Sequence, residues 1–270
     1  MSCDLRDQIQ RQIYFFGAYE PVEVYLLTHL LQPGMVVIDA GANVGQHTLI
    51  AAVEVGRHGE VHAFEPVPKN FRRLMAHVSD NGLADTVRTN RTALWHEAET
   101  VRLSLGSDKA SDGGYTIGVP PEAVDTVACP GVRLDDYVAE RKLDRVDFVK
   151  MDIEGAEWFA LQGAASVLAR WRPTMLVEIN RGACHRLGYE PERIWEFLRP
   201  YGYLMWAIGQ SPEMCRSLSS LDGVEGVNVI FHTGQLPTNV IEGWSYKSIL
   251  RFHRRNTHAA LRTRSQPDSK

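Results

Sequence analysis

The chain has 270 residues, of which 44% are hydrophobic and 23% charged, and its formal net charge is −4. This composition is ordinary for a globular protein with a core, and the charge gives no reason to expect a nucleic-acid partner. No apolar run approaches the length of a transmembrane helix, and the polar N-terminus lacks the apolar region of a signal peptide. We therefore expect a cytoplasmic protein with no membrane partner.

Two helices are predicted ahead of the first strand. Apolar residues recur at three- and four-residue steps over residues 4–16, and a second helix is expected over about 22–31. We treat residues 1–33 as an N-terminal helical extension. It could serve as a lid or as a homodimer contact, but we favour a helical cover on one face of a sheet.

Residues 36–66 carry the pattern around which the rest of the chain is organised. A buried strand at 36–38 is followed by a turn of small residues, a helix-like run that ends at Gly56, and a second strand at 61–64 that ends on Glu65. Glycines let a turn approach a ligand closely, and an acid after the second strand can accept hydrogen bonds from both ribose hydroxyls. The pattern predicts a site for a nucleoside-containing cofactor.

Asp39 distinguishes between two classes of cofactor. A dinucleotide site needs Gly-x-Gly-x-x-Gly for its pyrophosphate, whereas this turn reads Asp-x-Gly-x-Asn-x-Gly. The acid would repel a pyrophosphate and attract a cation, such as the amino group of a methionine-like moiety. We therefore favour S-adenosylmethionine over NAD. His47, just after the turn, could touch the cofactor or face solvent, and a turn of this type without any cofactor is the alternative.

Strands and helices alternate beyond residue 66. Strands are expected at 87–94, 101–105, 146–151, 175–180, 203–208 and 227–231, and helices at 68–81, from 133, at 158–168 and at 192–199. Such alternation is typical of a parallel sheet with helices on both faces. We predict an α/β, Rossmann-like domain over residues 34–235, with a mostly parallel sheet whose last strand is antiparallel.

Two stretches carry few regular signals. Residues 106–131 are rich in Gly, Pro, Ser and Asp, and we expect there a substrate loop or a wall beside the adenine. Residues 236–270 form a basic tail, predicted to be partly disordered with a short helix over about 249–261. We interpret this tail as a solvated terminus rather than as a contact for nucleic acid or membrane.

Polar side chains gather where the predicted strands end. Asp39, Glu65, Asp152 and Asn180 lie at such ends, and Glu178 lies close by. Ligands of parallel sheets bind beyond the carboxyl ends of the strands. We therefore expect these five residues to form the functional site.

Several motifs in a fixed order resemble the FkbM family of methyltransferases. They are I-D-A-G-A-N-V-G, A-F-E-P-V-P-K-N-F, L-D-D-Y, D-F-V-K-M-D-I-E-G-A-E and L-V-E-I-N, and the resemblance covers about residues 19–232. It implies a class I fold that uses S-adenosylmethionine and usually methylates oxygen. Family substrates include sugars and polyketide-type natural products.

The resemblance also implies roles for single residues. Asp39, Gly41, Asn43 and Gly45 would line the methionine end of the cofactor, Glu65 would meet the ribose, and Asp152 would lie where cofactor and substrate meet. We add the neighbouring His47 and Pro66 as further candidates for cofactor binding. Members often carry His two residues after the fifth-strand Glu, but this chain has Asn180. Asparagine can position a hydroxyl but cannot take its proton. The candidates for a base are Asp152, Glu154, His185 and Lys150.

The predicted catalytic residues are Asp152, Glu178, Asn180 and His185. Asp152 and Glu178 could also hold Mg²⁺, which would lower the pKa of a bound sugar hydroxyl. The plainer interpretation of these two acids is that they cap helices or form salt bridges. We predict methyl transfer from S-adenosylmethionine to a hydroxyl of a small molecule, a sugar or a natural product. The alternative is a non-catalytic S-adenosylmethionine-binding or scaffold protein of the same fold.

Overall fold

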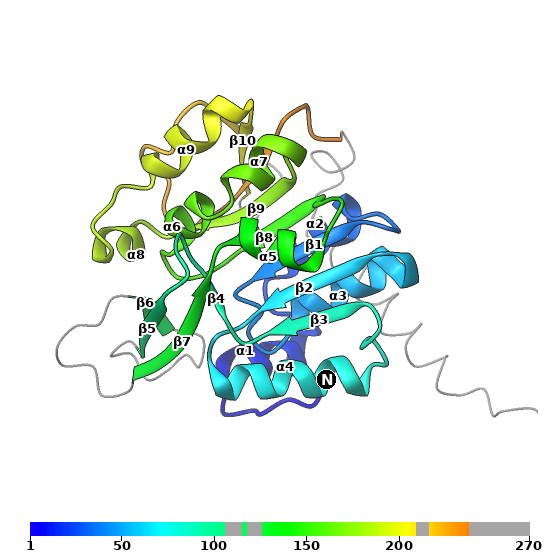
Figure 1. Ribbon diagram of the computed structural model, residues 1–270. Helices are drawn as coiled ribbons and strands as arrows, with labels where there is room; N and C mark the ends of the chain where they lie inside the picture. The colour runs from blue at the N-terminus through cyan, green and yellow to red at the C-terminus, as the bar shows by residue number, and fades with distance from the viewer. Residues whose placement is uncertain (106–114, 118–125, 209–215, 238–270) are drawn as a thin grey trace, which may run out of the picture.

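The computed structural model describes residues 1–105, 115–117, 126–208 and 216–237. Its central sheet has the strand order β11-β10-β12-β9-β8-β1-β2-β3 (Figure 1). The strands are β1 (Val36–Ala40), β2 (Glu60–Phe64), β3 (Val87–Asn90), β8 (Phe148–Met151), β9 (Thr174–Ile179), β10 (Leu204–Ile208), β11 (Arg216–Leu218) and β12 (Val227–His232). The five strands from β3 to β9 are parallel, whereas β12 runs antiparallel to both β9 and β10. The predicted α/β fold with an antiparallel last strand is confirmed.

Helices cover both faces of this sheet. One face carries α2 (Pro21–Leu30), α3 (Gln46–Val55) and α4 (Pro68–Asp80), and the other α5 (Leu134–Arg141), α6 (Glu157–Gln162), α7 (Ala165–Trp171) and α9 (Glu192–Leu198). The remaining helices are α1 (Gln8–Phe16), α8 (Arg181–Arg186) and the short 3₁₀ turns η1 (Gly56–His58) and η2 (Arg199–Tyr201). No helix in the described ranges is long and apolar enough to cross a membrane.

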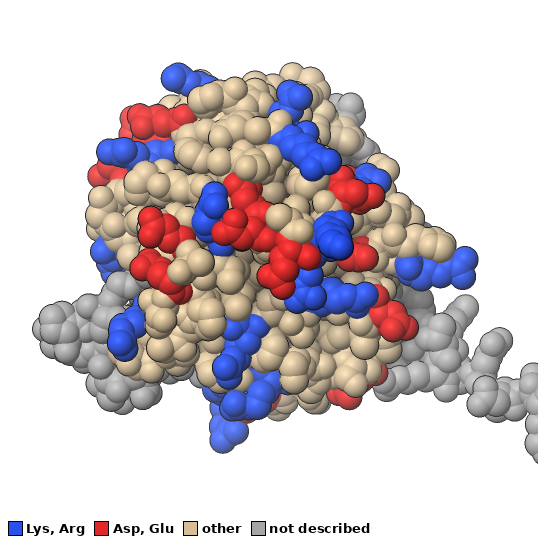
Figure 2. Space-filling view, in the orientation of Figure 1, with Lys and Arg blue, Asp and Glu red and all other residues tan. Residues whose placement is uncertain are grey.

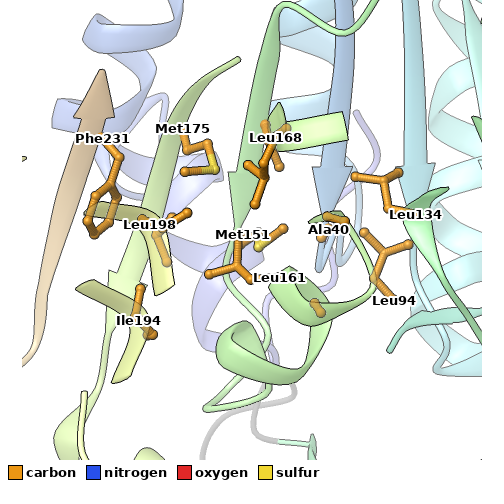
Figure 3. Close-up of a cluster of buried hydrophobic side chains, with 14 of the residues drawn as sticks. Ala40, Leu94, Leu134, Met151, Leu161, Leu168, Met175, Ile194, Leu198 and Phe231 are labelled. Atoms are coloured by element: carbon orange, nitrogen blue, oxygen red, sulfur yellow. The ribbon is translucent and has the colours of Figure 1, made fainter. Parts of the chain in front are cut away.

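The apolar run of β1 is buried on both faces because successive side chains of a strand point in opposite directions. Ile38 and Ala40 belong to the core under α5, α6, α7 and α9, while Val37 belongs to the core under α2, α3 and α4. Figure 3 shows the first core, where Leu161, Leu168 and Leu198 lie against the strand residues Met151 and Met175. Burial of this kind contributes about 1.5–3 kcal/mol for each large apolar side chain.

A second, smaller sheet lies beside the first. Its strands, in spatial order, are β4 (Ala93–Leu94), β7 (Thr126–Val132), β5 (Thr100–Leu105) and β6 (Tyr115–Ile117). The predicted strand at 87–94 is therefore wrong in extent, since it divides between β3 and β4. The loop interpretation of 106–131 is wrong at β6 and β7. Pro130 and Gly131 concealed β7 from the sequence pattern, yet Gly131 is needed because a Cβ there would lie 2.7 Å from Val101 Cγ2.

Other differences from the predicted elements have local causes. The helix expected at 158–168 is divided into α6 and α7 at Gly163, where a Cβ would overlap the carbonyl oxygen of Trp95. Helix α1 begins at Gln8 because the side chain of Asp7 accepts a hydrogen bond from the Gln10 N–H. Helix α8 and strand β11 were not predicted. The helix expected at 249–261 lies outside the described residues.

Candidate functional site

A cavity opens beyond the carboxyl ends of β1 and β8. These neighbouring strands are parallel, but β1 leads to β2 on one side and β8 leads to β9 on the other. Such a reversal of strand order leaves a crevice where α/β proteins bind ligands. The space between its walls, with the open mouth included, is about 1080 Å³.

The turn after β1 forms the floor of the cavity. Gly41 has φ +81°, and a Cβ on it would overlap the carbonyl oxygen of Asp152. Gly45 has φ +96° and precedes α3, with a would-be Cβ 2.7 Å from Leu74 Cδ1. Asn43 also lies in the left-handed region, with φ 50°. The backbone must therefore turn tightly and pack closely here, as the two glycines predicted.

Glu65 closes the cavity beyond β2, with Pro66 beside it. The backbone N–H groups of Asn43 and Val67 donate to its two carboxylate oxygens, each at 2.8 Å. Each oxygen keeps a second lone pair, so the fixed carboxylate can accept two more hydrogen bonds from a diol. Burial raises the pKa of Glu65 to about 7.

Asp39 occupies a different position from the one expected. Its Oδ2 accepts a hydrogen bond of 2.5 Å from Thr48 Oγ1, and its Oδ1 is buried with no hydrogen-bond partner among the described residues. Burial raises the pKa of this carboxyl. Gly41, Asn43 and His47 line the cavity, whereas Asp39 and Gly45 lie outside the lining and support the turn.

Buried Lys150 and half-buried Asp152 form an ion pair at the end of β8, with Nζ 3.1 Å from Oδ2. Burial disfavours the charge on Lys150, but the carboxylates of Asp152, Asp39 and Glu20 outweigh it and raise the pKa of Lys150 above its ordinary value. Burial likewise works against charge on Asp152, yet the Lys150 ammonium holds the pKa of Asp152 below its usual range. Both groups are therefore charged, and Lys150 has no lone pair with which to act as a base.

Two further glutamates line this end of the cavity. Glu178 Oε2 is buried without a hydrogen-bond partner among the described residues. Burial, followed by the charge of Asp152, raises the pKa of Glu178 to about 10, so it holds a proton at neutral pH. Glu154 has a left-handed backbone, with φ 55°, and burial raises its pKa to about 7.

Asn180 and His185 are not brought to the cavity. The side chain of Asn180 caps α8 by accepting a hydrogen bond of 3.0 Å from the Ala183 N–H. His185 is largely exposed, with Nε2 2.8 Å from Glu190 Oε2. Neither residue lines the cavity, and we keep neither in the site.

The sequence reasoning missed a wall of the site that comes from the N-terminal extension. Tyr19 and Glu20, between α1 and α2, line the cavity together with Ile9. The Tyr19 N–H donates to Gln46 Oε1 at 2.7 Å, and Gln46 Nε2 donates to the Tyr19 carbonyl at 2.6 Å. A Glu-Pro pair at a helix start is common, so no sequence signal marked Glu20 as a site residue.

A family model described as methyltransferase FkbM domain matches residues 39–205, more than half of the chain. The chain belongs to the FkbM family of S-adenosylmethionine-dependent methyltransferases. The resemblance predicted from the motifs is thereby confirmed.

Two curated relatives and one solved structure are similar to this FkbM-family chain. The 31-O-demethyl-FK506 methyltransferase FkbM of Streptomyces tacrolimicus is 31% identical over 160 residues, which are 49% of this chain and 60% of that protein. Methyltransferase 1 of Beauveria bassiana is 26% identical over 144 residues, 47% of this chain and 57% of its own. The chain thus spans less than two thirds of either relative. The methyltransferase FkbM structure from Methylobacillus flagellatus KT is 15% identical, with a TM-score of 0.49, and the match covers 85% of this chain and 61% of that one.

The cavity fits the cofactor that the family implies. The absence of a side chain at Gly41 lets the turn pack against the Asp152 carbonyl, so that the floor of the cavity there is backbone. Glu65 offers two free lone pairs for a ribose diol. Thr92 Oγ1 and Glu178 Oε2 are buried polar atoms of the wall that have no partner among the described residues. Buried polar groups normally find partners, so these atoms indicate that a polar ligand belongs here.

The same residues do not fit Mg²⁺. No group of three or more His, Cys, Asp or Glu side chains in the described ranges is arranged to hold a metal ion. At Asp152, the Lys150 ammonium already lies against one carboxylate oxygen and would repel a divalent cation. We therefore derive no step that depends on a metal.

Proposed function

We propose that the chain transfers the methyl group of S-adenosylmethionine to a hydroxyl of a small molecule, a sugar or a natural product. The observation that carries this proposal is Glu65, whose two oxygens are fixed by backbone N–H groups at the edge of a carboxylate-rich cavity. The name of the Streptomyces relative, which is a 31-O-demethyl-FK506 methyltransferase, supports oxygen as the atom that is methylated.

The places of several residues in the cavity wall support the following cofactor roles. Glu65 and Pro66 would hold the ribose, and Gly41, Asn43 and His47 would lie along the rest of the molecule. Asp39 and Gly45 would shape the turn from behind. When bound, S-adenosylmethionine supplies an already activated methyl group on a sulfonium, so the protein needs chiefly to orient the acceptor and exclude water.

Three acids at the carboxyl ends of β8 and β9 would handle the acceptor. Asp152 is charged and held by Lys150, so it can orient a hydroxyl by accepting its hydrogen bond. Glu154, with a pKa of about 7, suits a general base that takes the hydroxyl proton near neutral pH. Glu178, protonated at neutral pH, can donate a hydrogen bond to the acceptor or to Asp152.

A small-molecule acceptor agrees with the surface. On the face shown in Figure 2, Lys and Arg side chains are interspersed with Asp and Glu rather than gathered in one patch. Proteins that bind nucleic acid usually present a continuous basic surface to the phosphates. The charged residues that line the cavity are five acids and Lys150.

Calorimetric titration with S-adenosylmethionine and S-adenosylhomocysteine tests the cofactor assignment. Replacement of Glu65 by Ala removes two hydrogen bonds to a charged acceptor, so we expect affinity to fall about 10- to 100-fold. The exposed Glu97 provides the control, Glu97→Ala, which should bind as the wild type does. Addition of a metal chelator should leave the cofactor affinities of the wild type and of the Glu65→Ala variant unchanged.

A labelled methyl donor, offered with panels of sugars and polyketide alcohols, then tests transfer. Labelled product that is stable to mild base would indicate an ether and support the hydroxyl assignment. Tight cofactor binding without product from any panel would favour the non-catalytic alternative. If the wild type bound neither cofactor form, the proposal would fail at its first step.

A further inference from the structure

Residues 17–20, which we call the N-terminal strap, join α1 to α2 and close one side of the cavity. The two hydrogen bonds between the Tyr19 backbone and the Gln46 side chain hold the strap against the start of α3. The strap lies outside the segment that the family model matches, residues 39–205. The family match therefore says nothing about the strap, and its place in the cavity wall is an observation from this structure.

Glu20 is held in an unfavourable backbone conformation. Its φ is 50° and its ψ 65°, the left-handed region, and its side chain does not cap α2. A residue other than glycine or asparagine pays about 1–2 kcal/mol for this conformation. Strain of this kind persists where the surroundings enforce it and often accompanies a functional role. Glu20, in this conformation, is one of the residues that line the cavity.

Two other carboxyls of the wall already have defined partners, while Glu154 and Glu178 line the cavity at the ends of β8 and β9. Glu65 is fixed by two backbone N–H groups at the ribose end, and Asp152 is paired with Lys150. Asp39, which the turn motif suggested for a cationic group, lies outside the lining and accepts from Thr48. Next to α3, Glu20 is therefore the carboxyl of the lining that a cationic group could pair with.

Glu20 lies near the start of α3, whereas Glu65 contacts the glycine turn at Asn43. Its Oε2 is 4.0 Å from His47 Nε2, in the first turn of α3 directly after Gly45. Burial lowers the pKa of His47 to about 3, so this histidine is neutral and does not neutralise Glu20. A cofactor whose ribose binds Glu65 and which extends along the glycine turn would bring its amino-acid end close to Glu20 and His47.

We propose that Glu20 binds the ammonium group at the amino-acid end of the cofactor. The inference rests on the proposed function, because it presumes that S-adenosylmethionine occupies the cavity. The free N–H groups at the start of α3, which no side chain caps, suit the carboxylate of the same amino-acid end. The strap and α3 would then hold the two opposite charges of one zwitterion.

Three ligands separate this role from a general effect on the fold. S-adenosylmethionine and S-adenosylhomocysteine both carry the amino-acid end, whereas 5′-methylthioadenosine keeps the nucleoside and lacks that end. In calorimetric titrations, Glu20→Gln should weaken the first two about 10- to 100-fold, which is the usual effect of losing a charge-assisted hydrogen bond. Its affinity for 5′-methylthioadenosine should stay within about 3-fold of wild type. Glu97→Gln is the charge-matched control and should leave all three affinities unchanged.

Each other outcome would overturn the assignment. Unchanged affinity for all three ligands would remove Glu20 from the binding site. An equal loss for all three would mean that the substitution displaces the strap, and a loss for S-adenosylmethionine alone would place Glu20 at the sulfonium instead. None of these results touches the proposed function, which fails separately if the wild type binds neither of the two larger ligands.

Discussion

Gly41 lies at the point where the turn after β1 meets the end of β8. Both Gly41 and Gly34 have positive φ, +81° and +86°, but only at Gly41 would a Cβ overlap another part of the chain, the carbonyl of Asp152. At Gly34 no atom lies within 4 Å of the would-be Cβ. The two positions therefore separate the cost of the backbone conformation from the cost of a steric overlap.

Substitution of these glycines by Ala gives a matched pair. Gly34→Ala should lower the free energy of unfolding by about 1 kcal/mol, the usual cost of a left-handed Ala. Gly41→Ala should lower it by about 1–3 kcal/mol more, because the turn must move away from Asp152, and should also weaken cofactor binding. Urea denaturation and calorimetry measure the two effects. Equal free energies of unfolding for the two variants would mean that the turn moves away from Asp152 without any loss of stability.

The sequence identified some of these residues and not others, for reasons that are physical. Glu65 was found because an acid after the second strand has a known geometric relation to a ribose. The position of Asp39 could not be predicted, since its partner Thr48 looks like any residue of an amphipathic helix. Glu20 was missed because its role depends on the path of the strap, which Gln46 fixes from a distant part of the chain.

At the scale of elements, Gln46 joins the N-terminal strap to helix α3. The side chain of Gln46 is buried and satisfies both backbone groups of Tyr19. Helix α2 beyond the strap buries Leu26 and Leu27 in the core on that face, so it is anchored independently. Loss of the Gln46 bonds should therefore loosen the strap while α2 stays in place.

Gln46→Ala tests this arrangement. Two hydrogen bonds at about 1 kcal/mol each predict a loss of about 2 kcal/mol in the free energy of unfolding. Cofactor affinity should also fall, but by less than in the Glu20→Gln variant, because Gln46→Ala leaves the Glu20 carboxylate in the protein. Chemical denaturation, with the exposed Gln8→Ala as the control, measures the first effect. A loss of stability with full cofactor affinity would show that the strap is not needed to form the site.

The sequence predicted elements well where a single pattern governs them. Strands β1, β2, β8 and β9 are apolar runs buried on both faces, and their positions were expected. Strand β7 was missed because only alternate residues are buried and because Pro130 and Gly131 resemble a turn. The division of α6 from α7 depends on the contact of Gly163 with Trp95, which no local pattern contains.

At the scale of the molecule, the site concentrates acids whose charge the fold does not favour. Burial raises the pKa of Glu20 to about 8, of Glu65 and Glu154 to about 7, and of Glu178 to about 10. Glu20 faces Tyr19, Glu23, His47, Lys150, Asp152 and Glu178. Of these, Lys150 is the group that carries positive charge. A cationic ligand would thus relieve a repulsion that the ligand-free protein reduces by holding protons.

Two buried histidines act in the opposite direction. Burial lowers the pKa of His47 to about 3 and of His62 to about 4. Both must gain a proton on unfolding below about pH 6.5, so they reduce stability as the pH falls through that range. They bind no proton in either state at pH 8, and the raised glutamates alone then determine the pH dependence contributed by these buried groups.

The ligand-free protein should therefore lose stability as the pH rises from 6 to 8. A carboxyl whose pKa is raised in the folded state contributes stability that is complete below its unfolded pKa of 4.5 and is lost as the pH rises through the folded value. Glu178, with a pKa of about 10, should account for about 1.4 kcal/mol per pH unit across this whole range. Glu178→Gln should reduce the slope of unfolding free energy against pH by that amount, while the exposed Glu97→Gln should not. Urea denaturation at several pH values measures the slope, and an unchanged slope in Glu178→Gln would mean that Glu178 is ionised in the folded protein.

Saturation with S-adenosylmethionine should itself flatten the slope of unfolding free energy against pH, because the positive charges of this ligand favour the ionised acids around it.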